Sequence, residues 1–159
     1  MANDGLTRRN FVAAAGTAAA ATLVAGKASA APRRRYAIVG TGHRATGMWG
    51  RDLVRKYADV LEFVGLADIN PLRVEQAKKM IGVDCPTFTS LDQMLDQAKP
   101  ELLMVTTVDA FHSECIVKAL DRGIDVLTEK PMVIDEAQCQ AVLDAEKRSG
   151  RKLNVTFNY

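Results

Sequence analysis

The sequence predicts an α/β fold, in which a doubly wound parallel sheet lies between two layers of helices. Apolar runs of strand length alternate along its 159 residues with segments of helical periodicity, which is typical of strand–helix–strand units. The run 102–105 is apolar at every position, as expected of a parallel strand buried on both faces. The composition, 48% hydrophobic and 25% charged, is that of one globular domain.

Strands and helices are expected to alternate along the chain. The strands are predicted at 36–40, 61–67, 102–107, 125–129 and 152–157, with a weaker short strand at 87–88. The helices are predicted at 46–56, 71–81, a short segment after Ser90, 111–122 and 135–148. Ser90 and Gln93 have the spacing of a capping box. In the last helix, Ala137, Ala141 and Ala145 are expected to pack against the sheet.

A glycine turn follows the first predicted strand. The apolar run from Tyr36 stops at Gly40, and Gly42 and Ala45 follow before a helix-compatible segment. This is the G-x-G-x-x-G/A pattern of a Rossmann-type dinucleotide-binding fold. Gly40 permits the turn, Gly42 lets a diphosphate approach the backbone, and Ala45 lets the helix pack closely. A plain strand-to-helix turn is the alternative. The candidate cofactor-binding residues of this turn are Gly40, Thr41, Gly42, His43, Arg44 and Ala45.

Asp68 ends the second predicted strand, 26 residues after Gly42. A Rossmann-type fold places a carboxylate at this strand end, where it accepts hydrogen bonds from the hydroxyls of the adenosine ribose. The alternative role is structural, because Asp68-Ile69-Asn70-Pro71 also reads as a turn in which the aspartate caps the next helix. The two roles are compatible, and the ribose role is the one we favour.

Further ionisable side chains follow two later strands. His112 lies shortly after the predicted strand 102–107, and Glu129 and Lys130 stand at the end of 125–129. In a doubly wound sheet, ligands bind beyond the carboxyl ends of the strands. These groups therefore favour a binding site at that edge. The alternatives are a histidine satisfied by backbone groups at a helix start, and a surface lysine beside a turn.

The first 30 residues read as a targeting segment. Arg8 and Arg9 precede a mildly apolar, alanine-rich stretch, and Ala28-Ser29-Ala30 offers a small-x-small cleavage site. We expect a twin-arginine-type signal peptide at 1–30 and export to the periplasm by the twin-arginine machinery. An uncleaved membrane anchor is the weaker alternative, because the apolar stretch is short for a span. A basic arm at 31–35 and a nucleotide-binding domain at 36–159 are expected to follow.

The rest of the composition argues against several other kinds of site. The net charge of +2 comes from the first 30 residues, which hold three basic side chains and one acidic one. Nucleic-acid binding is therefore not expected. The three cysteines show no C-x-x-C spacing and the two histidines do not make up a zinc site with them, so no metal site is expected.

Several of these segments together resemble one family. Thr128-Glu129-Lys130-Pro131-Met132 is similar to the Glu-Lys-Pro motif of the glucose–fructose oxidoreductase/inositol dehydrogenase/rhizopine catabolism protein (Gfo/Idh/MocA) family. The resemblance covers residues 35–159, and some relatives are exported with bound nucleotide. The other segments that resemble the family are Ile38–Gly42, Leu66–Asp68, Thr107–His112 and Asn158-Tyr159.

The resemblance implies an oxidoreductase that transfers hydride between NAD(P) and a hydroxyl or carbonyl group of a sugar or polyol. The glycine turn would bind the diphosphate, and the acidic residue after the second strand would hold the adenosine ribose. Thr106, Thr107 and His112 would border the nicotinamide ribose, and Glu129 would touch the cofactor nearby. Lys130 would reach the nicotinamide and the substrate hydroxyl. It is therefore the catalytic candidate, with His112 as a second.

The family's second half has no counterpart in these 159 residues. In the relatives it is an open antiparallel sheet that shapes the sugar pocket, supplies the main acid/base histidine and commonly joins the chains into homo-oligomers. We therefore expect this chain to bind nucleotide with little or no turnover. A non-catalytic NAD(P)-binding or regulatory module is the alternative function.

The nature of the nucleotide follows from the charges near its ribose. Asp68 favours NAD because a carboxylate repels a 2′-phosphate, whereas Arg44 and Arg73 could offset that charge and admit NADP. An S-adenosylmethionine-binding domain also uses a glycine turn and an acidic strand end. The Glu-Lys-Pro segment argues against that third class.

Overall fold

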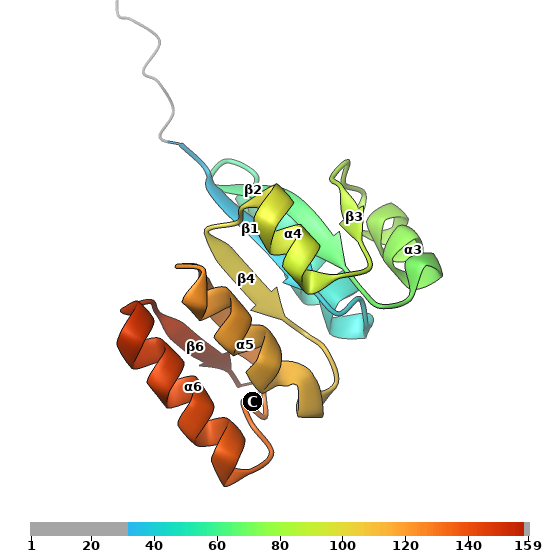
Figure 1. Cartoon of the computed structure of the whole chain (residues 1–159). Helices are drawn as coiled ribbons and strands as arrows, with labels where there is room; N and C mark the ends of the chain where they lie inside the picture. Colours follow the sequence, from blue (N-terminus) through green and yellow to red (C-terminus); the bar gives the residue numbers. More distant parts are fainter. Residues whose placement is uncertain (1–31, 158–159) are drawn as a thin grey trace, which may run out of the picture. The chain divides into compact units, whose positions relative to one another are not determined.

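Six parallel strands form one sheet in the order β3-β2-β1-β4-β5-β6 (Figure 1). The computed structural model describes residues 32–157. The strands are β1 (Arg34–Val39), β2 (Leu61–Ala67), β3 (Thr87–Phe88), β4 (Leu102–Val105), β5 (Asp125–Glu129) and β6 (Leu153–Thr156). This is the strand order of a doubly wound dinucleotide-binding sheet, and it confirms the predicted fold class. The expected signal peptide, 1–30, lies outside the described residues.

Helices cover both faces of the sheet. The helical elements are the π-helix η1 (Ala45–Asp52), α2 (Leu53–Tyr57), α3 (Pro71–Ile81), α4 (Leu91–Ala98), the 3₁₀ turn η2 (Asp109–Phe111), α5 (His112–Asp121) and α6 (Glu136–Ser149). In Figure 1, α4, α5 and α6 lie on the near face. Among the described residues, no helix is both long and apolar enough to span a membrane.

Each face of the sheet has its own apolar core. On one face, buried residues of η1 and α3 pack against β1, β2 and β4, including Ala45, Val74 and Ile81. On the other face, the larger core joins α4, α5 and α6 to the sheet. Tight packing on both faces fixes the strand ends, and therefore the loops that follow them.

Helix boundaries follow the local capping signals. Asn70 caps α3, because its side chain accepts hydrogen bonds from the backbone N–H groups of Leu72 and Arg73. The Ser90 hydroxyl accepts from the N–H of Gln93, which confirms the predicted N-terminal cap of α4. These caps supply partners for N–H groups that a helix cannot satisfy by itself.

The first helix differs from its prediction in hydrogen bonding. An α-helix was expected over 46–56, whereas residues 45–52 form a π-helix, which is followed by an α-helix at 53–57. Apolar spacing shows that a helix is present, but it does not show the size of its hydrogen-bonded ring. Gly50 lets this helix approach α3, because a Cβ there would lie 2.6 Å from carbons of Ile81.

Two other expectations are refined by the structure. The basic arm expected at 31–35 overlaps β1, which begins at Arg34, although Arg33 and Arg34 are exposed as expected of a solvated arm. The Arg34 guanidinium pairs with Asp125 at 2.5 Å, and the N–H of Arg35 donates to Glu101 at 2.9 Å. In α6, the buried residues are Val142 and Ala145, while the expected Ala137 and Ala141 are exposed. The larger valine covers more apolar surface than an alanine does, and it decides which face of the helix meets the sheet.

Candidate nucleotide-binding site

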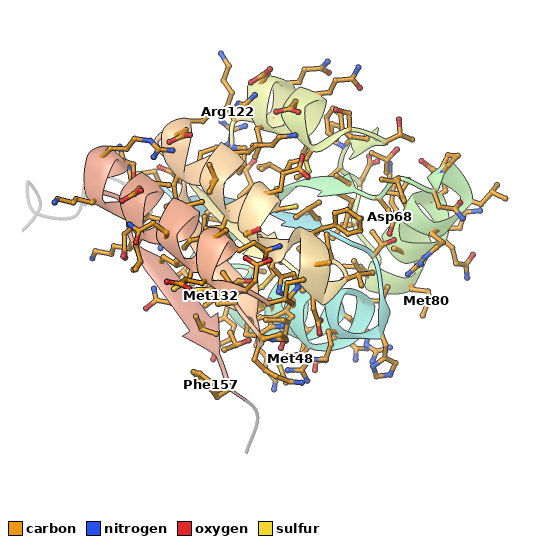
Figure 2. All side chains as sticks on the ribbon, turned by 60° about the horizontal axis from the view of Figure 1, so that its bottom comes forward. Met48, Asp68, Met80, Arg122, Met132 and Phe157 are labelled. Atoms are coloured by element: carbon orange, nitrogen blue, oxygen red, sulfur yellow. The ribbon has the colours of Figure 1, made fainter. Side chains whose placement is uncertain are left out.

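A cleft of about 620 Å³ lies at the carboxyl ends of β1, β2 and β4. These strands surround the point where the strand order reverses, because β1 pairs with β2 on one side and β4 on the other. A doubly wound sheet binds its ligand at such a point. The predicted site residues that line the cleft are Gly40, Thr41, Gly42, Asp68, Thr106 and Thr107. Figure 2 brings this edge forward, with Asp68 beside α3.

A second cavity, of about 640 Å³, lies at the opposite edge of the sheet and contains no predicted site residue. Two ion pairs join charged side chains of its lining. Arg34 pairs with Asp125, and the Arg122 guanidinium lies 3.0 Å from Asp96. We therefore place the candidate site in the first cleft, where the glycine turn and Asp68 meet.

Gly40 makes the sharp turn that the sequence predicted. Its φ of +84° belongs to the left-handed region, which residues with a Cβ rarely adopt. A Cβ at Gly40 would also lie 2.6 Å from the carbonyl oxygen of Thr106. The Thr106 hydroxyl in turn donates to the carbonyl of Gly40 at 2.7 Å. The turn is thus pressed against the end of β4, and only glycine fits.

Gly42 and Ala45 also occupy the positions that the motif requires. A Cβ on Gly42 would meet only the end of the Arg73 side chain, at 3.9 Å, so the space beside this backbone is open. An open, Cβ-free backbone beside a cleft suits a diphosphate. Ala45 is fully buried where η1 meets the sheet. Its small side chain allows the close packing that was predicted.

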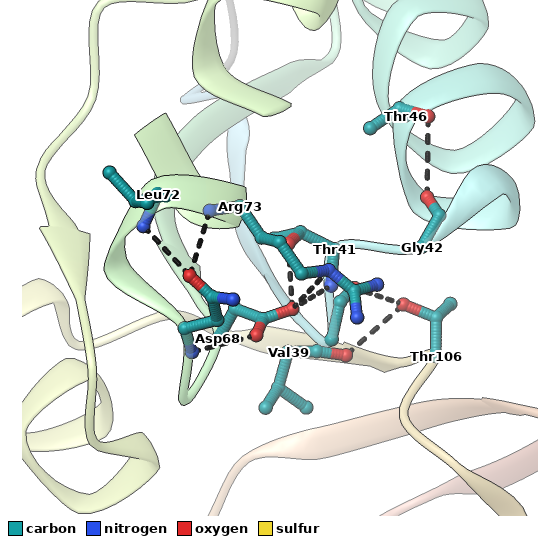
Figure 3. Close-up of polar contacts among 10 residues, drawn as sticks. Val39, Thr41, Gly42, Thr46, Asp68, Leu72, Arg73 and Thr106 are labelled. Carbon is teal, nitrogen blue, oxygen red and sulfur yellow. Dashed lines mark hydrogen bonds and ion pairs between the residues drawn. The ribbon is translucent and has the colours of Figure 1, made fainter. Parts of the chain in front are cut away.

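Asp68 is buried at the base of the cleft and is tied to the glycine turn (Figure 3). One carboxylate oxygen accepts from the N–H of Thr41 at 2.8 Å and from its hydroxyl at 2.7 Å. The other accepts from the N–H of Asn70 at 3.0 Å. Asp68 therefore shapes the turn, but Asn70, and not Asp68, caps α3.

The Asp68 carboxylate is held in its charged form. Burial alone would raise its pKa, but the hydrogen bonds from Thr41 and Asn70 and the nearby charge of Arg73 hold the pKa below its ordinary value. The Arg73 Nε lies 3.9 Å from the carboxylate, and its side chain is more than half exposed. The cleft is thus lined by the charged Asp68 carboxylate, a hydrogen-bond acceptor, and by the nearby Arg73 guanidinium.

Glu129 lies outside the cleft lining and contacts the first helix. Its Oε1 accepts from the Trp49 indole at 2.6 Å and from the Arg44 Nε at 2.8 Å. The carboxylate is nearly buried, which by itself would raise its pKa. The hydrogen bonds from Trp49 and Arg44 and the charge of Arg44 instead hold the pKa below its usual value. Arg44 is therefore paired with Glu129 and not placed beside Asp68, where it had been considered as a partner for the 2′-phosphate of NADP.

His112 is fully buried between two loops at the same edge. Its Nδ1 lies 2.7 Å from the carbonyl oxygen of Pro131, and its Nε2 lies 3.1 Å from that of Thr107. This arrangement matches the alternative of a histidine satisfied by backbone groups. Lys130 is exposed between Glu129 and Pro131, so its ammonium group is free of the core.

His43 is exposed in the glycine turn, and its role at the cofactor stays a prediction. Asn158 and Tyr159 lie outside the described residues. No group of three side chains suited to a metal ion gathers within residues 32–157.

Sequence reasoning missed two parts of this region. The first is Trp49, whose indole contacts a carboxylate 80 residues away in the chain. The second is the apolar wall formed by Leu91, Val108 and Phe111. Val108 and Phe111 follow β4 and are 70% and 57% exposed. The sequence signal that could have predicted this wall is the presence of apolar residues just after a strand end.

Known proteins are similar to this chain in sequence and in fold. YteT of Bacillus subtilis (strain 168) is 36% identical over 124 residues, which are 76% of this chain and 29% of that protein. Inositol 2-dehydrogenase of Azotobacter vinelandii (strain DJ / ATCC BAA-1303) is 28% identical over 111 residues, 68% of this chain and 33% of that enzyme. The chain thus spans about a third of the length of these relatives.

A solved structure agrees in its backbone. The WlbA dehydrogenase from Bordetella pertussis, in complex with NADH and UDP-GlcNAcA, superposes with a TM-score of 0.72 at 25% identity. The match covers 79% of this chain and 37% of that one. The family model described as "Oxidoreductase family, NAD-binding Rossmann fold" matches residues 34–157. The chain therefore belongs to the Gfo/Idh/MocA oxidoreductase family, through its NAD-binding Rossmann domain.

Proposed function

We propose that this chain is the nucleotide-binding part of an oxidoreductase that moves hydride between NAD and a sugar or polyol. The main support is the hydrogen-bonded pair of Thr41 and Asp68, which joins the carboxylate that we expect to bind the ribose to the glycine turn. The printed names of two relatives support the substrate class. One is an inositol 2-dehydrogenase, and the other is a dehydrogenase in complex with NADH and UDP-GlcNAcA.

Each part of the cleft suits one part of the nucleotide. The open backbone at Gly42 leaves room for the diphosphate, which the N–H groups at the start of η1 would favour. The charged carboxylate of Asp68 would accept hydrogen bonds from the adenosine ribose. The apolar wall around Val108 and Phe111 offers a surface for the adenine ring.

Lys130 is our candidate for contact with the substrate. Bound NAD supplies the hydride acceptor or donor, and the protein must orient the substrate oxygen and help its proton to leave. The exposed ammonium of Lys130 can donate hydrogen bonds to that oxygen and stabilise negative charge on it. Three N–H donors and a positive charge suit that role.

We propose that the 159-residue chain binds nucleotide with little or no turnover by itself. A hydride transfer from an alcohol needs a base that can reach the hydroxyl proton. His112 is buried with both ring nitrogens against carbonyl oxygens, so the proton of a substrate in the cleft is beyond its reach. This observation also favours the second candidate function, a non-catalytic NAD-binding module.

A fluorescence titration with NADH tests nucleotide binding. The wild-type chain should enhance and saturate NADH emission. Gly42→Ala should weaken binding by at least about tenfold, because its methyl group would occupy the space that the diphosphate needs. Gly47→Ala is the matched control, since a Cβ there meets nothing within 4 Å. Equal affinity of Gly42→Ala and Gly47→Ala would refute this placement of the diphosphate.

Turnover is tested with the same protein. The chain, with NAD and a polyol such as inositol, should produce no NADH above a protein-free control. Steady NADH formation that scales with protein concentration would show that these residues suffice for catalysis and would reject the non-catalytic module.

We further propose that the protein is exported by the twin-arginine route with its nucleotide bound. The support is the segment Arg8-Arg9 with its apolar stretch. Protein recovered from the periplasm should release NAD on denaturation, in near-equal molar amount. Recovery without nucleotide, together with millimolar affinity for NAD, would contradict transport of the loaded form. Lysine in place of both arginines should retain the protein in the cytoplasm.

A further inference from the structure

Glu129 joins the end of β5 to the first helix through a cluster of charge-assisted hydrogen bonds. Its Oε1 receives the Trp49 indole N–H at 2.6 Å and the Arg44 guanidinium, whose Nε and Nη2 both lie at 2.8 Å. Glu129 as a whole is only 8% exposed. A carboxylate buried to this degree is costly unless it is paired, so these three N–H groups, with a hydrogen bond from Thr156, hold it in place.

The two donors come from the segment that forms the glycine turn. Arg44 immediately precedes η1, two residues after Gly42, and Trp49 lies within η1. The contact therefore bridges 80 to 85 residues of chain between the diphosphate end of the site and β5. Because the donors sit on a helix packed against the sheet, they form a rigid support for Glu129.

A second anchor holds the other side of Lys130. The carbonyl of Pro131 lies 2.7 Å from the Nδ1 of His112, which is fully buried at the start of α5. Lys130 itself is exposed between the two anchored neighbours. The backbone on both sides of Lys130 is thus fixed, whereas its side chain extends away from the core.

We infer that Trp49 and Arg44 are positioning residues, which act through Glu129 to fix Lys130 relative to the glycine turn. This inference rests on the proposed nucleotide function. Binding at the nicotinamide end then depends on Trp49, while binding at the adenosine end, on Asp68 and the turn, does not. Trp49 is the sharper probe of the two, because Arg44 lies in the turn itself.

The test compares two nucleotides on the full chain by calorimetry. ADP offers the adenosine and diphosphate parts alone, and NADH adds the nicotinamide riboside. Trp49→Phe keeps an aromatic ring but loses the N–H donor. We expect it to weaken NADH binding by about five- to tenfold and to change ADP binding by less than about twofold.

Variants of Glu129 give an independent readout. Glu129→Ala should lose affinity for NADH as Trp49→Phe does, and Glu129→Gln should restore part of it, because its amide oxygen can still accept from the indole. Trp49 is the only tryptophan, so its emission in each variant reports directly whether the indole has been released. Asp125→Asn is the matched control, since it removes a carboxylate–arginine pair from the other end of β5.

The outcomes separate the inference from the proposed function. The positioning role is supported if Trp49→Phe loses affinity for NADH but not for ADP, and if Asp125→Asn binds both nucleotides as the wild type does. If Trp49→Phe weakens ADP binding and NADH binding equally, the positioning role is overturned and general damage to the fold is the explanation. Unchanged binding of both nucleotides would also overturn the positioning role. A wild-type chain that binds neither nucleotide would overturn the proposed function itself.

Discussion

Replacing Gly40 by alanine should destabilise the protein more than the same change at Gly82. Both glycines have a positive φ, +84° and +79°. They differ in their surroundings, because a Cβ at Gly82 would meet nothing within 4 Å, whereas one at Gly40 would lie 2.6 Å from the Thr106 oxygen. The pair therefore separates the cost of the backbone conformation from the cost of the close approach to β4.

The expected magnitudes follow from these two costs. A left-handed conformation costs a residue with a Cβ roughly 1–2 kcal/mol, which is the whole penalty at Gly82. At Gly40 the contacting atoms belong to the backbone and cannot rotate away, so the end of β4 must shift. Overpacking of this kind adds about 1–3 kcal/mol. The lower entropy of the unfolded alanine chain applies to both variants and cancels in the comparison.

Urea denaturation followed by circular dichroism measures the difference. The free energy of unfolding, extrapolated to water, should fall by about 1–2 kcal/mol for Gly82→Ala and by about 2–5 kcal/mol for Gly40→Ala. Because domains of this size are stable by roughly 5–15 kcal/mol, both variants should remain measurable. If the two free energies fall equally, the contact between the turn and Thr106 does not constrain the fold, and our account of Gly40 is wrong.

Three further predictions follow from buried or charged groups. Among the described residues, the buried Tyr36 hydroxyl has no hydrogen-bond partner. Tyr36→Phe should therefore raise the free energy of unfolding by up to about 1 kcal/mol in urea, and a clear loss would reveal a partner. Glu129 and Asp68 have lowered pKa values in the folded state, so their contribution to stability is present above the unfolded pKa and is lost as the pH falls through the folded one. The urea concentration at the unfolding midpoint of the wild type should therefore fall when the pH is lowered below about 4. Glu129→Gln should show a smaller fall. If the midpoint of this variant depends on pH as that of the wild type does, the Glu129 carboxylate does not contribute as proposed. Asp68→Ser should improve NADP binding relative to NAD, because Arg73 stays beside the ribose position, and a constant ratio in parallel titrations would contradict that role.

The sequence determines most of this fold through short-range signals. β2, β5 and α3 lie where they were predicted, since an apolar run, a capping residue or a turn residue marks each end. The glycine turn and Asp68 were also found, because close backbone approach and an acidic strand end have recognisable spacing. These features depend on residues that are close together in the chain, so they can be predicted from the sequence.

Contacts between residues far apart in the chain could not be predicted from the sequence. Nothing near Glu129 in the chain indicates that its partners are Arg44 and Trp49, because that choice depends on how η1 lies against β5. The burial of both His112 nitrogens likewise depends on two loops that meet only in the folded protein. In α6 several apolar stripes were available, and packing against the sheet selected the one with Val142.

The position of β4 beside β1 also sets an order of events during synthesis. The glycine turn leaves the ribosome early, but the wall it rests on, at Thr106, is 66 residues further along the chain. A nascent chain that ends before β4 can pair β1 with β2 and still lacks one side of the cleft. Cofactor cannot therefore stabilise the growing polypeptide until β4 and Thr106 have been translated.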